Sequence, residues 1–219
     1  MLILNGTKDF SALMKERVRK APNKSISLDP VSDMQWVCHV VKIKRKNCVI
    51  TMEVQTRYCM VFIDVKKADA AHFPQRFIKR LATEMSLMHD SPMGHFERNM
   101  KVLAKHHAKT LICKRNHRSV QSHINDVVWH LQNHAKNTGA LPATPKEVVN
   151  FGVFVNKQLR STKAMPDYFY PYERMQEQWS KWFPELELAP ISEVGVAKAI
   201  DEKFTKKATL MSYTKQTLH

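Results

Sequence analysis

Residues 36–65 read WVCHVVKIKRKNCVITMEVQTRYCMVFIDV, and this stretch decides the fold. Three runs rich in β-branched and other apolar residues, 36–43, 48–54 and 58–65, are separated by short polar connections. In the second run, apolar and polar side chains alternate with the period of two that is typical of a half-buried strand. Consecutive strands joined by short connections pair with each other, so the sequence predicts a three-stranded antiparallel meander.

The remainder of the chain carries mainly helical patterns. Leu-Ile-Leu at residues 2–4, followed by Asn5-Gly6, predicts a short N-terminal strand that ends in a turn. Apolar residues at helical spacing predict further helices at about 10–18, 70–90, 95–109, 119–136, from 145 and from 171. Residues 110–114 fit a short strand or an extended link.

These patterns predict an α+β fold. We expect one antiparallel sheet, made of the N-terminal strand and the meander, to be packed by helices, with a helical C-terminal half. Residues 1–184 are expected to form a single domain, and residues 185–219 an amphipathic segment followed by a basic tail. The tail contains Lys206, Lys207 and Lys215 but no acidic residue after 204, so we expect a cationic arm that becomes ordered on a polyanion.

The charge balance favours a polyanionic partner. The 219 residues include 35 Lys and Arg against 20 Asp and Glu, a formal net charge of +15 at pH 7. Such a field attracts nucleic acid first, an anionic membrane surface second and an acidic partner protein third. No apolar run is long enough to span a bilayer, and the N-terminus does not resemble a secretory signal, so we expect neither a membrane partner nor export.

Several kinds of site have no sequence motif here. The chain contains neither a GxGxxG nor a GxxxxGK[ST] loop, so it does not resemble dinucleotide-binding or P-loop proteins. Cys38, Cys48, Cys59 and Cys113 form no CxxC pair and have apolar neighbours, which predicts buried thiols in a reducing cytoplasm. His123, His130 and His134 share a helix face but do not form an HExxH motif. We therefore predict no metal and no cofactor.

A set of short motifs resembles an uncharacterised bacterial domain family. In order, the motifs are WVCH at 36–39, RKNCVI at 45–50, KKAD at 66–69, and NHRSV at 116–120 with IND at 124–126. The chain departs from the family pattern at Gly6, His39 and His117, where other residues are usual. The resemblance covers roughly residues 1–135 and more faintly reaches Glu173. It implies an α+β fold and a bacterial or mobile-element origin, but no established activity.

The Asn116–Asp126 box is the best candidate site in the sequence. In a structural interpretation, Ser119 caps the helix that begins there and Arg118 pairs with Asp126. In a functional interpretation, the same helix N-terminus binds a phosphate, because its free N–H groups attract anions. The second interpretation draws on the cations beside the box, Lys114, Arg115 and Arg118.

We expect a nucleic-acid-binding protein, cytoplasmic and of bacterial or mobile-element origin, that holds RNA or DNA mainly by phosphate contacts. The candidate phosphate-binding residues are Lys44, Arg45, Lys46, Arg76, Lys79, Arg80, Arg98, Lys101, Lys105, Lys114, Arg115, Arg118 and Ser119.

Two alternatives stay open. The first is a metal-independent, toxin-like enzyme that cleaves RNA, with His117, His123 and Asp126 as acid–base groups within about two helical turns. The second is a scaffold that binds an acidic partner protein.

Overall fold

The computed structural model describes residues 1–15, 18–19, 34–87, 92–106, 110–115, 117–163, 165–184 and 186. Its elements, in chain order, are β1 (Leu2–Gly6), α1 (Lys8–Leu13), β2 (Val18–Arg19), β3 (Met34–Ile43), β4 (Lys46–Glu53), β5 (Cys59–Phe62), the 3-10 helix η2 (Lys67–Ala71), α2 (Phe73–Ser86), α3 (Pro92–His106), β6 (Thr110–Lys114), α4 (Arg118–Asn137), α5 (Pro145–Asn156), β7 (Arg160–Thr162), β8 (Met165–Phe169) and α6 (Pro171–Trp182).

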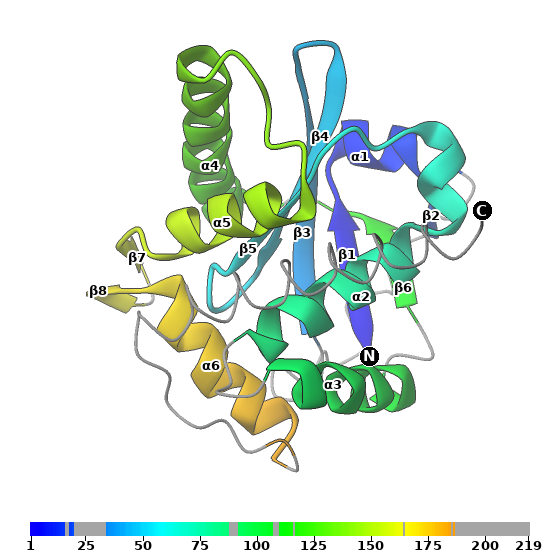
Figure 1. The fold of residues 1–219 in the computed structure, drawn as a ribbon, viewed down its shortest axis with the longest axis vertical. Coiled ribbons are helices and arrows are strands. Elements are labelled where there is room, and N and C mark those ends of the chain that lie inside the picture. Colours follow the sequence, from blue (N-terminus) through cyan, green and yellow to red (C-terminus); the bar gives the residue numbers. More distant parts are fainter. Residues whose placement is uncertain are drawn as a thin grey trace, which may run out of the picture.

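The predicted meander is present at one side of a six-stranded sheet, whose order is β2-β6-β1-β3-β4-β5 (Figure 1). Strands β3 and β4 pair antiparallel, as do β4 and β5. The β3–β4 turn has Lys44 at φ 47° and Arg45 at φ 64°. Positive φ at both central residues is the conformation of a tight two-residue hairpin, which matches the twist of the strands. The α+β class is therefore confirmed.

The prediction of a purely antiparallel sheet is wrong, because the sheet is mixed. β1 pairs in parallel with both β3 and β6, and β2 pairs in parallel with β6. Residues 110–114, which fitted either a strand or a link, form β6. A parallel pair needs a long crossover, which residues 7–33 supply between β1 and β3. All five residues of β1 are buried, as expected for a strand between two neighbours and two helical layers.

Two helical predictions also need correction. The helix expected at 10–18 ends at Leu13, and Val18–Arg19 belong to β2. The C-terminal half is not wholly helical, because β7 and β8 form a hairpin in it. In contrast, α5 begins as its sequence predicts. Thr144 Oγ1 accepts a hydrogen bond from the Glu147 N–H, and the Glu147 carboxylate accepts one from the Thr144 N–H.

Helices cover both faces of the sheet. Successive side chains of β3 point to opposite faces of the sheet. Trp36 lies in a core shared with α1, α2, α3 and α6, and Val37 lies in a second core shared with α4 and α5. Trp36 is fully buried and lies edge-on to Phe77 of α2, with ring centroids 5.0 Å apart. The sheet therefore separates α2 and α3 from α4 and α5, and this separation determines which charged residues lie on the same side.

All four cysteines are buried and unpaired, as the sequence predicts. None of the helices in the described part of the chain has the length and apolar character needed to cross a membrane. The predicted amphipathic segment and basic tail, 185–219, lie outside the described residues except for Leu186.

Candidate functional site

The predicted box forms the start of α4, although Asn116 itself lies outside the described residues. His117, and not Ser119, is the N-cap residue, and its side chain makes no capping hydrogen bond. Ser119 lies in the first turn, where its Oγ is 3.2 Å from His117 Nδ1. Asp126 pairs with Arg160, 3.7 Å away, and not with Arg118 as the structural interpretation expected. The start of α4 therefore faces residues from other parts of the chain.

Arg57 reaches the start of α4 from the turn between β4 and β5. One carboxylate oxygen of Glu53 accepts hydrogen bonds from the N–H groups of Gln55 (2.8 Å) and Thr56 (2.6 Å) and from the Thr56 hydroxyl (2.9 Å), which fixes this turn. Arg57 follows with φ 60°, and only 5% of its surface is exposed. Its Nη2 donates to Ser119 Oγ at 3.4 Å, while Nε and Nη1 have no partner among the described residues.

Arg160 reaches the same place from the end of α5. The Asn156 side chain accepts from the N–H of Cys59 (2.7 Å) and donates to its carbonyl (2.8 Å), so that it completes the free edge of β5. This pair of bonds ties the end of α5 to the strand that follows Arg57. Arg160, the first residue of β7, is consequently placed near Arg57 and is only 4% exposed.

The Arg160 guanidinium contacts α4 through a single nitrogen. Its Nη1 lies 3.3 Å from His123 Nδ1, 3.4 Å from the His123 carbonyl oxygen and 3.7 Å from an Asp126 carboxylate oxygen. A guanidinium only donates hydrogen bonds, so His123 Nδ1 accepts and this ring is the neutral tautomer with its proton on Nε2. Arg160 Nε has no partner among the described residues.

Burial and the two arginines together shift the titration of this site. Burial lowers the pKa of His123, and the positive charges of Arg160 and Arg57 lower it further, whereas Asp126 opposes them. The pKa of His117 is lowered by burial and then by Arg57 and Arg115. Both imidazoles are therefore mainly neutral at pH 7. Burial lowers the Arg57 pKa as well, with Glu53 opposing this shift and Arg160 adding to it.

We call Arg57, Arg160, His117, Ser119 and His123 the arginine cluster. Its unpaired guanidinium nitrogens are buried donors, and a buried donor without an acceptor is costly to keep. Arginine presents its N–H groups in a planar fork that matches carboxylate and phosphate oxygens. The arrangement is therefore suited to binding an oxyanion beside the first turn of α4.

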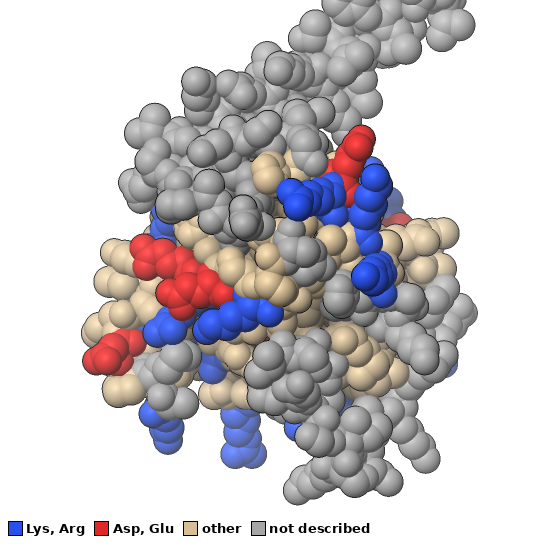
Figure 2. Space-filling view, turned by 90° about the horizontal axis from the view of Figure 1, so that it is seen from below, with Lys and Arg blue, Asp and Glu red and all other residues tan. Residues whose placement is uncertain are grey.

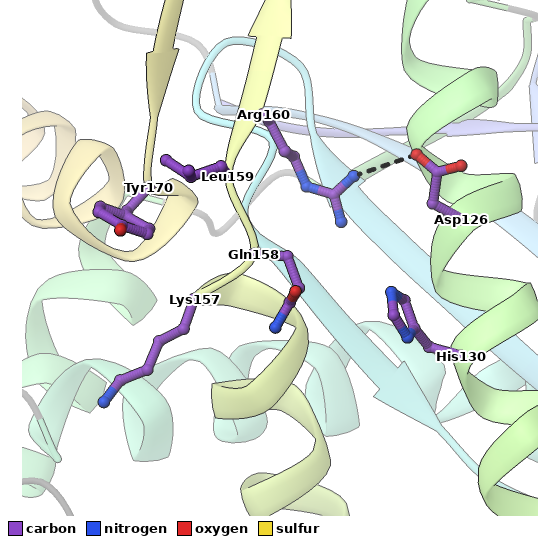
Figure 3. A pocket seen from close by; sticks show the side chains of 7 residues that line it. All are labelled: Asp126, His130, Lys157, Gln158, Leu159, Arg160 and Tyr170. Atoms are coloured by element: carbon purple, nitrogen blue, oxygen red, sulfur yellow. Dashed lines mark ion pairs between the residues drawn. The ribbon is translucent and has the colours of Figure 1, made fainter.

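A pocket of about 430 Å³ opens beside the cluster. Figure 3 shows the Arg160 side chain at one end of it, pointing toward Asp126 on α4, with His130 further along the same helix. Gln158 lies between them, and Leu159 and Tyr170 lie on the opposite side (Figure 3).

The other predicted phosphate-binding residues fall into separate groups. Lys44, Arg45 and Lys46 lie at the β3–β4 turn, where Lys44 Nζ donates to the carbonyl of Gly139 beyond the far end of α4 (Figure 1). The groups on α2 and α3 lie across the sheet from α4. They are Arg76, Lys79 and Arg80, and Arg98, Lys101 and Lys105. Figure 2 shows Lys and Arg in several clusters, some beside Asp and Glu, on the face seen from below.

Arg80 has an internal partner. Its Nε donates to the carboxylate of Glu84, which is 5% exposed and also accepts a 2.6 Å hydrogen bond from the Tyr58 hydroxyl. Only Lys114, Arg115, Arg118 and Ser119 of the predicted set lie beside the arginine cluster in the chain, at the end of β6 and the start of α4. The predicted phosphate-binding residues therefore form distinct groups on different sides of the sheet.

Sequence reasoning missed Arg57 and Arg160, the most buried cations of the site. Each stands in a short polar stretch, with no spacing that relates it to the box.

The helix face that carries His123, His130 and His134 makes contacts with aromatic rings. The centroid of the His130 ring lies 5.3 Å from that of Phe154, and the centroid of the His134 ring lies 5.9 Å from that of Phe151. Within the described residues, no group of three His, Cys, Asp or Glu side chains is placed to hold a metal.

Comparison with known families agrees with the resemblance seen in the sequence. A family model described as a domain of unknown function matches residues 3–174, from β1 into α6. No curated protein and no solved structure matches the chain.

Proposed function

The chain belongs to the DUF6933 family, a domain of unknown function, and from the contacts around α4 we propose that this protein binds nucleic acid, mainly through its phosphates. The observation that carries the proposal is the pair of buried arginines at the start of α4, Arg57 and Arg160, whose guanidinium groups include nitrogens without a partner in the described part of the chain. A cytoplasmic setting and a bacterial or mobile-element origin, expected from the sequence, belong to the same proposal.

A phosphate oxygen would supply the acceptors that these guanidinium groups do not find among the described residues. An unsatisfied buried donor costs roughly 1–3 kcal/mol, so a ligand that pairs Arg57 and Arg160 recovers that energy on binding. The N-terminal N–H groups of α4 and the exposed Arg118 add attraction to the same anion. The net charge of +15 favours a polyanion over a single small anion, because it attracts the whole backbone.

The proposal is tested on protein freed of nucleic acid by nuclease and a high-salt wash. Binding of labelled RNA and DNA is measured by fluorescence anisotropy over a range of salt concentrations, for wild type, Arg57→Met, Arg160→Met and the control Lys136→Met. Lys136 is an exposed cation in the last turn of α4, so the control removes the same charge away from the site.

We expect each site variant to lower affinity about tenfold and the control to lower it by much less, because a charge-assisted hydrogen bond is worth roughly 1.5–3 kcal/mol. The logarithmic salt slope should fall by about 0.7 for each phosphate of a single strand that the variant no longer neutralises. Equal effects of all three substitutions would show that only net charge matters. Binding of an acidic protein in place of RNA and DNA would favour the scaffold hypothesis.

A second candidate function, metal-independent RNA cleavage, is favoured by the two histidines of the cluster. Burial lowers the pKa of both His117 and His123, and the charge of Arg57 lowers both further. In this reaction a neutral imidazole removes the proton from a ribose 2′-hydroxyl, and the oxygen attacks the adjacent phosphorus. The bond from phosphorus to the 5′ oxygen breaks, and the other imidazole, protonated, gives that oxygen its proton. The products are a 2′,3′-cyclic phosphate and a free 5′-hydroxyl.

The cleavage hypothesis has its own test. His117→Ala or His123→Ala should abolish cleavage in the presence of a chelator while affinity changes little, since neutral imidazoles attract phosphate weakly. Because both pKa values lie below the usual 6.5, the rate should peak on the acidic side of pH 6.5, where one ring is protonated and the other is not. Wild-type protein that leaves RNA intact at every pH would refute this hypothesis. Asp126, the third predicted catalytic group, faces Arg160 and is not needed for either proton transfer.

A further inference from the structure

The surface beside the arginine cluster is unusually rich in exposed rings. The large apolar side chains that the structure exposes are Trp129 (59%), Phe154 (48%), Leu159 (53%), Tyr168 (74%) and Tyr170 (40%). Trp129, Phe154, Leu159 and Tyr170 come from α4, α5, the α5–β7 connection and the residue before α6, so distant parts of the sequence meet here, whereas Tyr168, on β8, does not line the pocket. Exposed aromatic side chains gathered on one part of a surface mark a binding site more often than chance.

Two of these exposed rings, Trp129 and Phe154, contact the ring of His130, which lies between them. The His130 ring meets that of Trp129 at a centroid distance of 4.9 Å and that of Phe154 at 5.3 Å, each edge-on. His130 also lines the 430 Å³ pocket, as do Leu159 and Tyr170. The exposed rings therefore continue into the pocket, whose end is occupied by the buried cation Arg160 (Figure 3).

We propose that this pocket binds one unpaired base of single-stranded nucleic acid, RNA being the form for which we design the test. This proposal rests on the proposed function, because the phosphate next to that base would lie on Arg57 and Arg160. A pocket of this volume lies in the range of small-ligand sites. Single-strand binding proteins combine a cationic track for the backbone with aromatic rings on which bases stack.

The polar groups in the pocket suit the edge of a base. Gln158 contributes a side-chain amide, whose nitrogen donates one hydrogen bond to the Phe154 carbonyl at 3.1 Å and keeps a second N–H and its oxygen. Asp126 contributes a carboxylate, and its side chain is 65% exposed although it lies near Arg160. An amide offers both a donor and an acceptor, and a carboxylate accepts from exocyclic amino groups. In a duplex the bases are paired and stacked inside the helix, so the pocket should discriminate against double strands.

The test compares three probes: a short labelled single-stranded RNA, the same RNA in a duplex, and an abasic strand of equal length that keeps the ribose-phosphate backbone. They are measured against wild type, Tyr170→Ala, His130→Leu and the control Tyr168→Ala. Tyr168 is the more exposed tyrosine and does not line the pocket, so it is a matched control for Tyr170. His130→Leu keeps apolar bulk against Phe154 but removes the second ring of the pocket.

We expect wild type to prefer the single strand to both other probes. Tyr170→Ala should weaken single-strand binding about 5- to 150-fold, corresponding to ~1–3 kcal/mol per stacked base, and should leave abasic binding unchanged. His130→Leu should act in the same direction, and Tyr168→Ala should match wild type.

Different failures are distinguishable. If wild type binds the abasic strand and the single strand alike and Tyr170→Ala changes neither, the base pocket is refuted while phosphate binding stands. If Tyr168→Ala and Tyr170→Ala weaken binding equally, the pocket is not the determinant and the inference is also refuted. If wild type binds no probe, the proposed function fails and this inference with it. In that case the exposed rings would belong to a contact with a protein.

Discussion

Replacing Arg57 by methionine should raise the stability of the protein while it weakens RNA binding. Methionine keeps most of the side-chain length but carries no charge. Arg57 is 5% exposed, its one hydrogen bond to Ser119 is 3.4 Å long, and two of its nitrogens are unpaired. Each buried donor without an acceptor costs roughly 1–3 kcal/mol, so removing the guanidinium relieves that cost, and the lost attraction between Arg57 and Glu53 offsets part of the gain. In a domain of this size 1 kcal/mol shifts the melting temperature by roughly 2–4 °C.

We therefore expect the melting temperature of Arg57→Met to rise by roughly 2–8 °C, for a net gain of about 1–2 kcal/mol. The assay is thermal unfolding followed by circular dichroism, in phosphate-free buffer so that no anion occupies the site. RNA affinity, measured in parallel, should fall about tenfold, since roughly 1.5 kcal/mol of charge-assisted bonding is lost. The combination of higher stability and weaker binding is typical of a binding-site residue.

The matched control is Arg80→Met, because Arg80 is also largely enclosed but pairs with the buried carboxylate of Glu84. Removing one partner of a buried pair costs ~3–5 kcal/mol, so this variant should melt roughly 6–20 °C lower. Its RNA affinity at a temperature where it is folded should match wild type. A melting temperature for Arg57→Met that falls by more than about 4 °C would refute the reasoning, because Arg57 would then be a structural residue.

Three further outcomes are expected. Burial lowers the pKa of His117, His123 and His130 in the folded protein, so below about pH 6.5 the unfolded chain binds more protons than the folded one. The melting temperature should therefore fall as the pH is lowered from 7, and it should fall less when phosphate is bound. Asn156→Ala breaks both bonds to the β5 edge and should cost about 1–3 kcal/mol in denaturant unfolding, with weaker RNA binding because Arg160 is no longer held near Arg57. Thr144→Ala removes the cap of α5 and should cost ~1 kcal/mol without changing affinity; lower affinity in this variant would contradict the assigned site.

The parts of the fold that could be predicted are those with local partners. Each strand of the meander pairs with the next strand along the chain, so the alternation of apolar and polar residues and the turn residues are enough to predict this pairing. The Thr144–Glu147 cap is likewise local. β1 differs, because its partners β3 and β6 are distant in sequence and the apolar pattern carries no strand direction. The mixed sheet follows from tertiary pairing that the pattern does not encode.

The candidate site was predicted in part for the same reason. The start of α4 could be recognised because a polar box precedes an apolar helical stripe. Arg57 and Arg160 could not, because the Asn156 bonds that bring them together join distant segments. The number of Lys and Arg residues along the chain does not show where they lie in the fold. It could not reveal that the sheet separates the cations of α2 and α3 from those of α4. The Arg80–Glu84 pair, four residues apart on one helix, is a contact that spacing alone could have suggested.

The most direct test of the account is a titration of arginine-labelled protein with short single-stranded RNA, observed through the side-chain Nε–H signals by NMR. Arg57 and Arg160 each have a buried Nε without a partner among the described residues. We predict that these two signals shift together and most strongly as RNA is added, with Arg80, already bonded to Glu84, unchanged. Shifts confined to the exposed arginines of α2 and α3, with Arg57 and Arg160 unmoved, would contradict the account.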